Sequence, residues 1–254
     1  MKLRQAISTA EGKQRYVRRL FATIADRYDF ITGFLSYGQD RRWKRRLIQL
    51  ADLQPEDRIL DLACGTGDIV FAGAQSVDRA VGLDVTHRML QLARQRSGPA
   101  KAGHYVPGVA GHPCHPRFVT GDMLALPFPD RSFTVVTIGY GLRNVADLTH
   151  SLEEIRRVLS PHGRVLSLDF NRPSNPIVRA AYLIYLTIVG SALGFVLHGD
   201  PNTYRYIPES IRNYPGAAGV AFMMKQSGFT DVRVIRVLGG LMAIHTASVP
   251  YTKD

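Results

Sequence analysis

The sequence has few cysteines and no export signal that we recognise. Two cysteines, Cys64 and Cys114, occur in 254 residues, which is too few for a disulfide framework. The N-terminal region has no apolar run followed by a small-residue cleavage site, so nothing there has the form of a secretory signal peptide. We therefore expect a protein of the reducing cytoplasm whose fold depends on a packed core.

The sequence also lacks a Ser/Gly-rich linker, an internal repeat and a low-complexity run. Hydrophobic residues make up 45% of the chain, which is enough for one sizeable core. We expect a single α/β domain over residues 1–254, with a helical N-terminal segment over about 1–54. An insertion over about 171–214 is expected to cover a site.

Acidic residues are scarce relative to basic ones. There are 21 Asp and Glu against 32 Lys and Arg, which gives a formal net charge of +11. This balance favours an anionic partner, either nucleic acid or an acidic membrane surface, although a basic surface without a partner remains an alternative. The early basic residues are Arg15, Arg18, Arg19, Arg41, Arg42, Lys44, Arg45 and Arg46.

One glycine-rich stretch, Ile59 to Asp68, dominates the pattern. An apolar run leads into a turn that contains Gly65, Thr66 and Gly67, and a second apolar run follows. A buried strand, a tight turn and a helix form half of a nucleotide-binding βαβ unit. The turn lacks the third glycine of a dinucleotide fingerprint and the Gly-Lys-Ser/Thr of a phosphate loop. Acidic residues bracket it, which favours a cationic ligand with amine and hydroxyl groups.

Two further acidic residues follow predicted strands. Asp84 ends the strand Arg79–Asp84 and lies 19 residues (84 − 65) beyond Gly65, the spacing of a carboxylate that binds ribose hydroxyls. Asp122 ends the strand Phe118–Asp122, although an Asp after a Gly is by itself only a turn former.

The remaining pattern predicts a doubly wound sheet that ends in an antiparallel hairpin. Further strands are expected at Phe133–Ile138, Arg164–Phe170, Asp231–Leu238 and Leu241–Val249, and the last two are joined by Gly239-Gly240. Helices are expected at Asp40–Ala51, Val70–Ser76, His87–Gln95, Asp147–Leu159 and Ala217–Ser227. The aromatic segment Ala25–Gly38 is either a cover over a ligand or a surface loop.

An uncharged run of 18 residues, Ala180–Leu197, is long enough to be a borderline transmembrane candidate. It lies between two strands of one predicted sheet, so a membrane span would separate them. We favour a helix that covers the site and touches both substrate and membrane. A buried core helix is the second interpretation and a true span the third.

Two groups of histidines have alternative explanations. His112-Pro-Cys-His115 includes metal-ligating residue types, but no second paired set follows, so we expect a surface loop and no metal. His245 lies in an apolar strand, where a packed core histidine is more common than a catalytic base.

Asp61-Leu-Ala-Cys-Gly-Thr-Gly-Asp68, together with Asp84, resembles the S-adenosylmethionine-dependent methyltransferases of the Rossmann-like class. More specific segments resemble the C-methyltransferase family of ubiquinone and menaquinone biosynthesis. They are Gly141-Leu-Arg-Asn-Val145, Ala125-Leu-Pro-Phe-Pro-Asp130 and Tyr204-Arg-Tyr-Ile-Pro-Glu-Ser-Ile211. The resemblance covers roughly Tyr28 to His245.

The resemblance implies a seven-stranded fold that binds S-adenosylmethionine as methyl donor. Asp122 and Met123 would contact the adenine, and Asp61 would lie near the amino group of the ligand or support a backbone amide. Two positions depart from the pattern, with Asp40 where relatives commonly have His and Gly139 where they often have Ser. The implied cofactor-binding residues are Asp61, Gly65, Thr66, Gly67, Asp84, Asp122, Met123 and Gly139.

The family resemblance also implies an acceptor, a polyprenyl quinol in which a phenolate activates the ring carbon. Arg143 is the candidate that stabilises the phenolate, with Asn144 as a polar orienter, and a structural salt bridge is the alternative role. Tyr204, Arg205 and Tyr206 would line the ring pocket. Demethylmenaquinol is the favoured substrate, and the benzoquinol precursor of ubiquinone is the second.

The polyprenyl tail implies peripheral contact with the cytoplasmic face of a membrane, and a homodimer remains open. No RNA-binding module is visible, so we expect no nucleic-acid partner. The competing interpretations are a methyltransferase for another lipid or phenol, and a basic protein without enzymatic activity.

Overall fold

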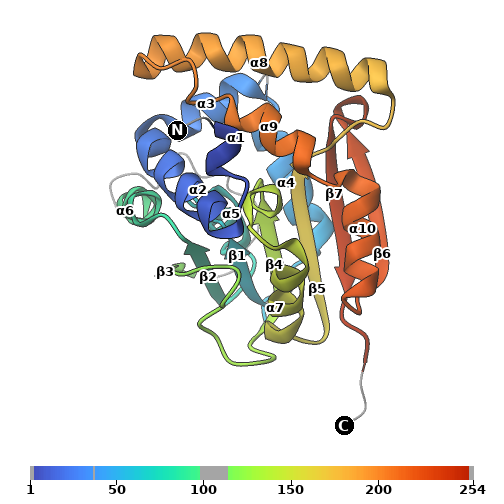
Figure 1. Ribbon diagram of the computed structural model, residues 1–254. Coiled ribbons are helices and arrows are strands. Elements are labelled where there is room, and N and C mark those ends of the chain that lie inside the picture. Colours follow the sequence, from blue (N-terminus) through green and yellow to red (C-terminus); the bar gives the residue numbers. More distant parts are fainter. Residues whose placement is uncertain (1–2, 37, 98–113, 252–254) are drawn as a thin grey trace.

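A single seven-stranded sheet forms the centre of the computed structural model, which describes residues 3–36, 38–97 and 114–251 (Figure 1). The strand order is β3-β2-β1-β4-β5-β7-β6. The strands are β1 (Arg58–Leu62), β2 (Arg79–Asp84), β3 (Arg117–Thr120), β4 (Phe133–Gly139), β5 (Leu159–Phe170), β6 (Thr230–Val237) and β7 (Met242–Ser248).

The first five strands are parallel, and β7 runs antiparallel between β5 and β6. The expected terminal hairpin is therefore confirmed. The chain order reverses beside β1, which pairs with β2 on one side and β4 on the other. In an open α/β sheet, ligands bind at the carboxyl ends of the strands at such a reversal. The glycine turn directly follows β1 at this position.

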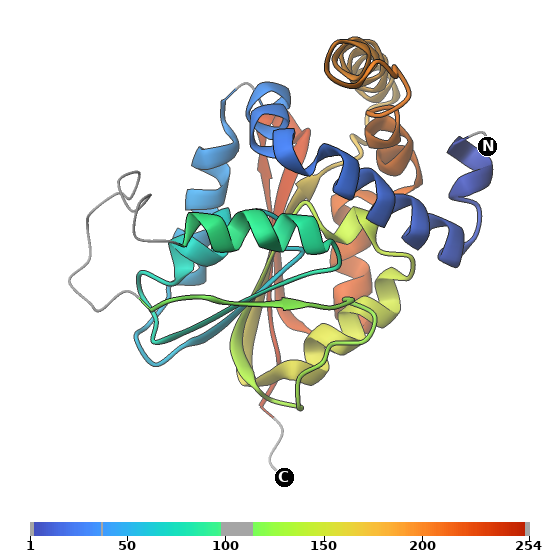
Figure 2. The ribbon, with the colours of Figure 1, turned by 90° about the vertical axis from the view of Figure 1, so that its left-hand side faces the viewer.

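Helices cover both faces of the sheet (Figure 2). The helices are α1 (Leu3–Ala6), α2 (Ala10–Ile24), α3 (Tyr28–Leu35), α4 (Asp40–Ala51), α5 (Asp68–Gly73), α6 (His87–Arg96), α7 (Leu148–Val158), α8 (Pro176–His198), α9 (Tyr206–Asn213) and α10 (Gly216–Gln226). Short 3-10 turns are η1 (Ala25–Arg27), η3 (Leu142–Asn144) and η4 (Leu238–Gly240).

The apolar core has two parts, one on each face of the sheet. Side chains alternate along a strand. Ile59 therefore belongs to the cluster that includes residues of α4 and α5, and its neighbour Leu60 belongs to the cluster that includes residues of α7 and α10. All the central strand residues in these clusters are buried, as expected for parallel strands covered on both faces.

Most elements differ from the predicted bounds by one or two residues, and strand β3 ends at Thr120, so Asp122 lies just beyond the strand and does not end it. Two elements differ more. The first crossover helix is α5, Asp68–Gly73, and starts directly at the glycine turn instead of at Val70. Strand β5 starts at Leu159 and includes the Pro161-His-Gly163 run, with an irregular register against β4 near Phe133.

Two segments of the chain lie above the carboxyl ends of the strands (Figure 1). One is the N-terminal set of helices α2 and α3, and the other is α8 with α9. Segment Ala25–Gly38 is thus helical over most of its length, where a surface loop was one of two interpretations. Between these segments and the sheet lie the two cavities that form the site.

Candidate active site

The glycine turn approaches its surroundings more closely than side chains would permit. Gly65 and Gly67 have positive φ angles of 55° and 93°. A Cβ atom at Gly67 would lie 2.6 Å from the ring of Phe71, so only glycine fits there. The Tyr28 ring of α3 lies 3.7 Å from the Cβ position of Gly65. Helix α3 therefore covers the turn, as one interpretation of that segment required.

Asp84 fastens the glycine turn to the end of β2. Its Oδ2 accepts a hydrogen bond from the Gly65 N–H at 2.9 Å, and its Oδ1 accepts one from the Thr86 N–H at 2.7 Å. Burial raises the pKa of the Asp84 carboxyl, while these backbone donors favour its ionised form. A carboxylate has about four acceptor positions, so it retains capacity for two ribose hydroxyls.

The first cavity, here called the cofactor groove, has a volume of about 80 Å³. Asp84 and Asp122 line it, together with Met123 and the backbone of Gly139. Helix α2 forms its roof, because Gln14 Nε2 donates a hydrogen bond to Asp122 Oδ2. The lining described by the structure contains carboxylates but no lysine or arginine. Such a donor set fits a ligand that carries positive charge, amino groups and hydroxyls.

A side chain at Gly139 would crowd Ile69. A Cβ atom there would lie 2.5 Å from Ile69 Cδ1, so a serine does not fit without a shift of that side chain. The departure from the family pattern therefore has a steric explanation. Gly139 presents only backbone to the cofactor groove.

Asp61, Thr66 and Gly67 lie outside the lining of the cofactor groove. Asp61 is fully buried and accepts a hydrogen bond from the Thr137 hydroxyl at 2.8 Å. Burial raises the pKa of Asp61 to about 7, although the Thr137 hydroxyl, Lys44 and the Val70 amide oppose the shift. Asp61 thus bonds to the neighbouring strand, and its two expected roles stay predictions.

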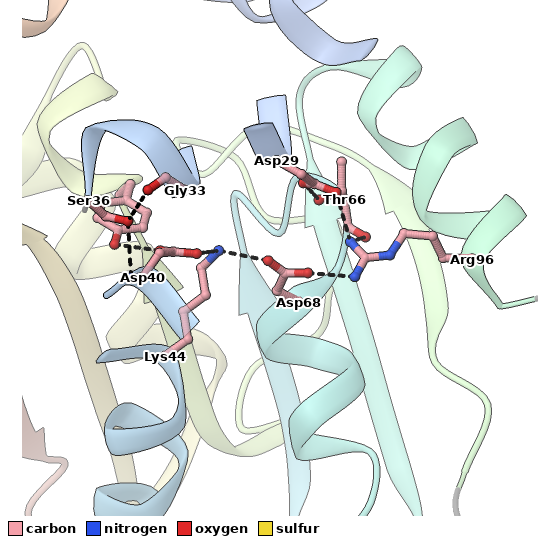
Figure 3. Close-up of polar contacts among 9 residues, drawn as sticks. Asp29, Gly33, Ser36, Asp40, Lys44, Thr66, Asp68 and Arg96 are labelled. Carbon is pink, nitrogen blue, oxygen red and sulfur yellow. Dashed lines mark hydrogen bonds and ion pairs between the residues drawn. The ribbon is translucent and has the colours of Figure 1, made fainter. Parts of the chain in front are cut away.

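A chain of ion pairs joins α4 to the glycine turn (Figure 3). Lys44 Nζ lies 2.7 Å from Asp40 Oδ2 and 2.8 Å from Asp68 Oδ2. Arg96 of α6 contacts Asp68 at 2.7 Å and Asp29 of α3 at 3.5 Å. Burial opposes ionisation of Asp68, but the two cations outweigh it and lower its pKa to about 2.

The Thr66 hydroxyl completes this chain by donating to Asp29 Oδ1 at 2.7 Å. Arg96 also donates to the Thr66 carbonyl at 3.0 Å. Thr66 thus holds the turn against α3 and has no contact with the groove. The prediction that Thr66 contacts the cofactor therefore does not match its position.

The second cavity, here called the acceptor cavity, has a volume of about 510 Å³ and an apolar lining. It lies beneath α8 and beside α2 and α3. Arg143 is the charged side chain in the lining that the structure describes. Aromatic and aliphatic residues form most of the rest, among them Phe21, Ile31, Trp43, Phe170, Tyr185 and Leu186.

Arg143 is held rigidly at the wall of the acceptor cavity. It is 6% exposed, and its Nε lies 3.4 Å from Asp169 Oδ1. Its NH1 donates to the Tyr140 carbonyl at 3.2 Å and to Asn144 Oδ1 at 3.1 Å. The guanidinium lies 4.8 Å from the centre of the Phe170 ring. Arg143 therefore forms a buried salt bridge and also faces the cavity.

Tyr140 connects the two expected catalytic residues. It adopts a positive φ of 60°, which costs energy for a residue with a side chain. Its carbonyl accepts hydrogen bonds from both Arg143 and the Asn144 amide, the latter at 2.8 Å. Its hydroxyl donates to Asp40 Oδ1 at 2.7 Å. No motif in the sequence marked Tyr140 as a site residue, and Asp40 stood out only as a departure from the family pattern.

The two cavities share part of one wall. Phe21, Tyr28 and Tyr140 line both of them. Turn η3 lies at the same junction, with Arg143 in the lining of the acceptor cavity and Asn144 in that of the cofactor groove. Two successive residues thus face two adjoining sites.

The structure separates the three expected ring-pocket residues. Tyr204 and Tyr206 are buried and line the acceptor cavity, and the Tyr206 hydroxyl donates to Asn144 Oδ1 at 3.1 Å. Arg205 is exposed and donates to Asn202 Oδ1 at 3.1 Å, so its assignment to the pocket is corrected. Adjacent residues at the start of α9 point in different directions, which explains the difference.

His245 lies in the core, 2.9 Å from the Ala217 carbonyl through Nε2 and outside both cavities. Burial lowers its pKa, although the Ala217 carbonyl favours the protonated form. Among the described residues, no group of three His, Cys, Asp or Glu could hold a metal ion. His112 and Pro113 of the His112–His115 run lie outside the described residues.

Comparison with known proteins places this geometry in a family. The model of the ubiE/COQ5 methyltransferase family matches residues 9–249. The ubiquinone/menaquinone biosynthesis C-methyltransferase UbiE of Ectopseudomonas mendocina is 37% identical over 94% of this chain and 90% of its own length. The demethylmenaquinone methyltransferase of Thermus thermophilus is 38% identical over 91% of this chain and its full length.

Solved structures with the same fold are more distant in sequence. A putative S-adenosyl-L-methionine-dependent methyltransferase from Methanococcus maripaludis has a TM-score of 0.60 at 16% identity, over 91% of this chain and 94% of its own. This match supports the fold alone. The family model and the two relatives show that the chain is an S-adenosylmethionine-dependent methyltransferase and belongs to the ubiE/COQ5 methyltransferase family.

Proposed function

We propose that the protein methylates a ring carbon of a polyprenyl quinol, with demethylmenaquinol as its main substrate. The observation that carries this proposal is the junction of the two cavities, where Arg143 lines the acceptor cavity and the adjacent Asn144 lines the cofactor groove. A methyl donor in the groove and a ring in the acceptor cavity would meet at this junction. Alignment of the two reactants is the main contribution of a protein to such a displacement.

The cofactor groove suits the donor. S-adenosylmethionine, when bound, supplies a methyl group on a positively charged sulfur. Asp84 would accept the ribose hydroxyls, and Asp122 with Met123 would contact the adenine. Gly65 lines the groove without a side chain and would leave room for the methionine part. Carboxylates without a competing lysine or arginine favour this cationic ligand over a phosphate.

Arg143 would activate the acceptor electrostatically. A quinol hydroxyl has a pKa of about 10, so its ring carbon becomes strongly nucleophilic only when a phenolate is stabilised. A guanidinium in an apolar wall provides this stabilisation without itself losing a proton. Tyr206 and Tyr140 hold Asn144 in place through hydrogen bonds, so Asn144 would orient the ring at the junction.

The apolar lining supports an isoprenoid acceptor over a polar one. A cavity of about 510 Å³ lined by aromatic and aliphatic residues fits a ring and the first units of a tail. Relatives with about the same identity are named for both naphthoquinone and benzoquinone pathways. The 2-methoxy-6-polyprenyl-1,4-benzoquinol of ubiquinone synthesis is therefore the second acceptor to test.

Such an acceptor would bring the enzyme to a membrane. A long polyprenyl tail stays in the bilayer, so the protein would work peripherally on its cytoplasmic face. The net charge of +11 would favour anionic lipid there.

The test is a methyl-transfer assay with labelled S-adenosylmethionine. Reduced demethylmenaquinone, the demethylated benzoquinol, an unrelated phenolic lipid and an RNA pool are offered as acceptors. We expect label in demethylmenaquinol, and label in both quinols would mean one enzyme for two pathways. If donor binding is confirmed but label enters neither quinol, the proposal is wrong.

Two variants serve as a matched pair in this assay. Tyr206→Phe removes the hydrogen bond to Asn144 inside the cavity and should lower the rate. Arg205→Ala alters the adjacent residue, which is exposed and outside the lining, and should leave the rate unchanged.

A further inference from the structure

Helix α8 is apolar on all sides, yet the rest of the chain leaves most of it uncovered. It is the helix among the described residues that is long and apolar enough to cross a membrane, and only 22% of its most apolar 18-residue stretch is buried. Ile188 is 64% exposed and Phe195 is 66% exposed. A helix without a polar face is normally enclosed by protein or lipid. The buried core helix considered from the sequence is therefore excluded.

The chain around α8 prevents it from spanning a bilayer. After Gly199 the chain turns back and packs along the last turns of α8. A Cβ atom at Gly190 would lie 3.3 Å from Tyr204, and one at Gly194 would lie 2.5 Å from the Asp200 carbonyl. Helix α9 follows on the same side, so both ends of α8 remain attached to one domain. The helix therefore lies flat across the molecule, as Figure 1 and Figure 2 show from two directions.

A second exposed apolar group lies on the neighbouring helix α3. Phe30 and Phe34 stack with ring centres 6.3 Å apart and are 60% and 51% exposed. On the other side of α3, Ile31 packs in one cluster with Leu193 of α8. We name the exposed apolar residues of these two helices the docking face. They are Ile177, Val178, Ile184, Ile188, Phe195 and Val196 of α8, with Phe30 and Phe34 of α3.

The docking face includes the mouth of the acceptor cavity. Ile177 and Val178 in the first turn of α8 line that cavity and are also exposed. Leu238 in η4 lines the cavity as well and is 42% exposed. The cavity therefore opens between the start of α8 and η4, and the rim of the opening is apolar.

We propose that the docking face lies on an anionic bilayer and that the acceptor's tail enters directly from the lipid between the start of α8 and η4. This inference rests on the proposed function for the identity of the acceptor. A flat helix would bury its outer side at the boundary between head groups and acyl chains. The tail would then pass from lipid to cavity without crossing water.

Charge and geometry favour a bilayer over a second copy of the chain. Arginines lie near both ends of α8, with Arg172 and Arg179 near its start and Arg27 bonded to the Leu197 carbonyl near its end. Their long side chains can reach phosphate groups while their stems cover apolar surface. A second copy on the docking face would close the mouth of the acceptor cavity instead.

The surface is tested by vesicle flotation of the full chain. Vesicles are phosphatidylcholine alone or a 7:3 mixture with phosphatidylglycerol. Ile188→Glu and Phe195→Glu place a charge on the docking face, whereas Phe222→Glu alters a comparably exposed residue, 62% exposed, on α10. We expect the first two variants to bind the mixed vesicles at least tenfold more weakly and Phe222→Glu to bind like the wild type.

Assays with two substrates distinguish a failure of the docking face from a failure of the proposed function. Ile188 and Phe195 lie outside both cavity linings. Their variants should therefore methylate a short-tailed, water-soluble demethylmenaquinol analogue at the wild-type rate and lose most activity on the long-tailed quinol in vesicles. If the variants lose activity on both substrates, or bind vesicles like the wild type, the proposal that the docking face binds the membrane is overturned. A wild type that methylates neither substrate would refute the proposed function instead.

Two measurements examine the orientation and the tail's route. Sedimentation of the wild type and of Ile188→Glu tests for a dimer formed through the docking face. A wild-type dimer that dissociates in the variant would contradict the proposal that this face lies on a bilayer. A long-tailed quinol with a diazirine in its tail should label peptides around Val178 and Leu238. Labelling confined to α2 would exclude entry between α8 and η4.

Discussion

The role assigned to Arg143 makes opposite predictions for two neighbouring residues. Arg143→Gln removes the cation from the acceptor cavity, whereas Asp169→Asn removes the anion beside it and keeps nearly the same shape. Nε of Arg143 lies 3.4 Å from Asp169 Oδ1, and both residues are buried. If Arg143 stabilises a phenolate, the first substitution should raise the pKa of the bound quinol and the second should lower it.

The size of the effect follows from Coulomb's law. A full charge about 4 Å from the phenolate oxygen contributes roughly 4 kcal/mol at an effective dielectric constant of about 20. Asp169 stays in place when Arg143 is replaced, so Arg143→Gln loses the whole of this contribution. An energy of about 4 kcal/mol corresponds to a rate loss of about 1000-fold and a pKa change of about 3. The alkaline rise in rate should therefore move up by about 3 pH units, because the phenol must ionise without the cation.

The assay is kcat as a function of pH with a soluble, short-tailed quinol at saturating donor. Donor affinity, measured by calorimetry, should stay the same in both variants, because Arg143 and Asp169 lie outside the lining of the cofactor groove. Asp169→Asn should move the rise in rate to lower pH. If both variants lose activity by the same factor at every pH, the pair has only a structural role and our reasoning is refuted.

Three further predictions concern the cofactor side. Gly139→Ala should lower the free energy of unfolding by about 1–3 kcal/mol, because its Cβ would lie 2.5 Å from Ile69 Cδ1. Ile69→Val in the same chain should restore part of this loss in urea unfolding, and no restoration would contradict the steric account. Asp84→Asn should weaken donor binding at least tenfold in calorimetry. The reason is that an amide N–H would then face a backbone N–H such as that of Gly65. Unchanged affinity would exclude the role of Asp84 in binding the ribose. The pKa of Asp68 is lowered to about 2. Its ion pairs should therefore add about 2 kcal/mol to the free energy of unfolding above pH about 4, and this stabilisation should be lost as the pH falls toward 2. Urea unfolding at several pH values should thus show wild type and Asp68→Asn converging on acidification, and a constant difference would argue against the ion pairs.

Features encoded by adjacent residues could be predicted from the sequence. The glycine turn, Asp84 and the hairpin depend on local patterns and on regular spacing in a βαβ fold, and the structure has them where expected. Arg143 and Asn144 were chosen because they follow a predicted central strand. Their contact with two separate cavities required the structure.

Contacts between distant residues could not be predicted in this way. The Tyr140–Asp40 bond joins residues 100 positions apart, and the Gln14–Asp122 bond spans 108 positions. No periodic pattern in a single sequence marks such pairs. Arg205 shows a different error. It was assigned to the ring pocket together with Tyr204 and Tyr206, but its side chain is exposed while theirs are buried.

The uncharged segment shows a third limit. Its side chains are apolar on every side, so periodicity gave no preferred face and three placements stayed open. The choice depends on the chain after Gly199, which turns back along the helix. This information lies outside the segment itself.

The roof formed by α2 has a consequence for substrate binding by the enzyme. Donor binding at Asp122 should break the Gln14–Asp122 hydrogen bond and so move α2, because Gln14 now occupies one oxygen of that carboxylate. Phe21 on the same helix also lines the acceptor cavity, so that movement reshapes both sites. Donor and acceptor should therefore change each other's affinity, and by thermodynamic necessity the factor is the same in both directions.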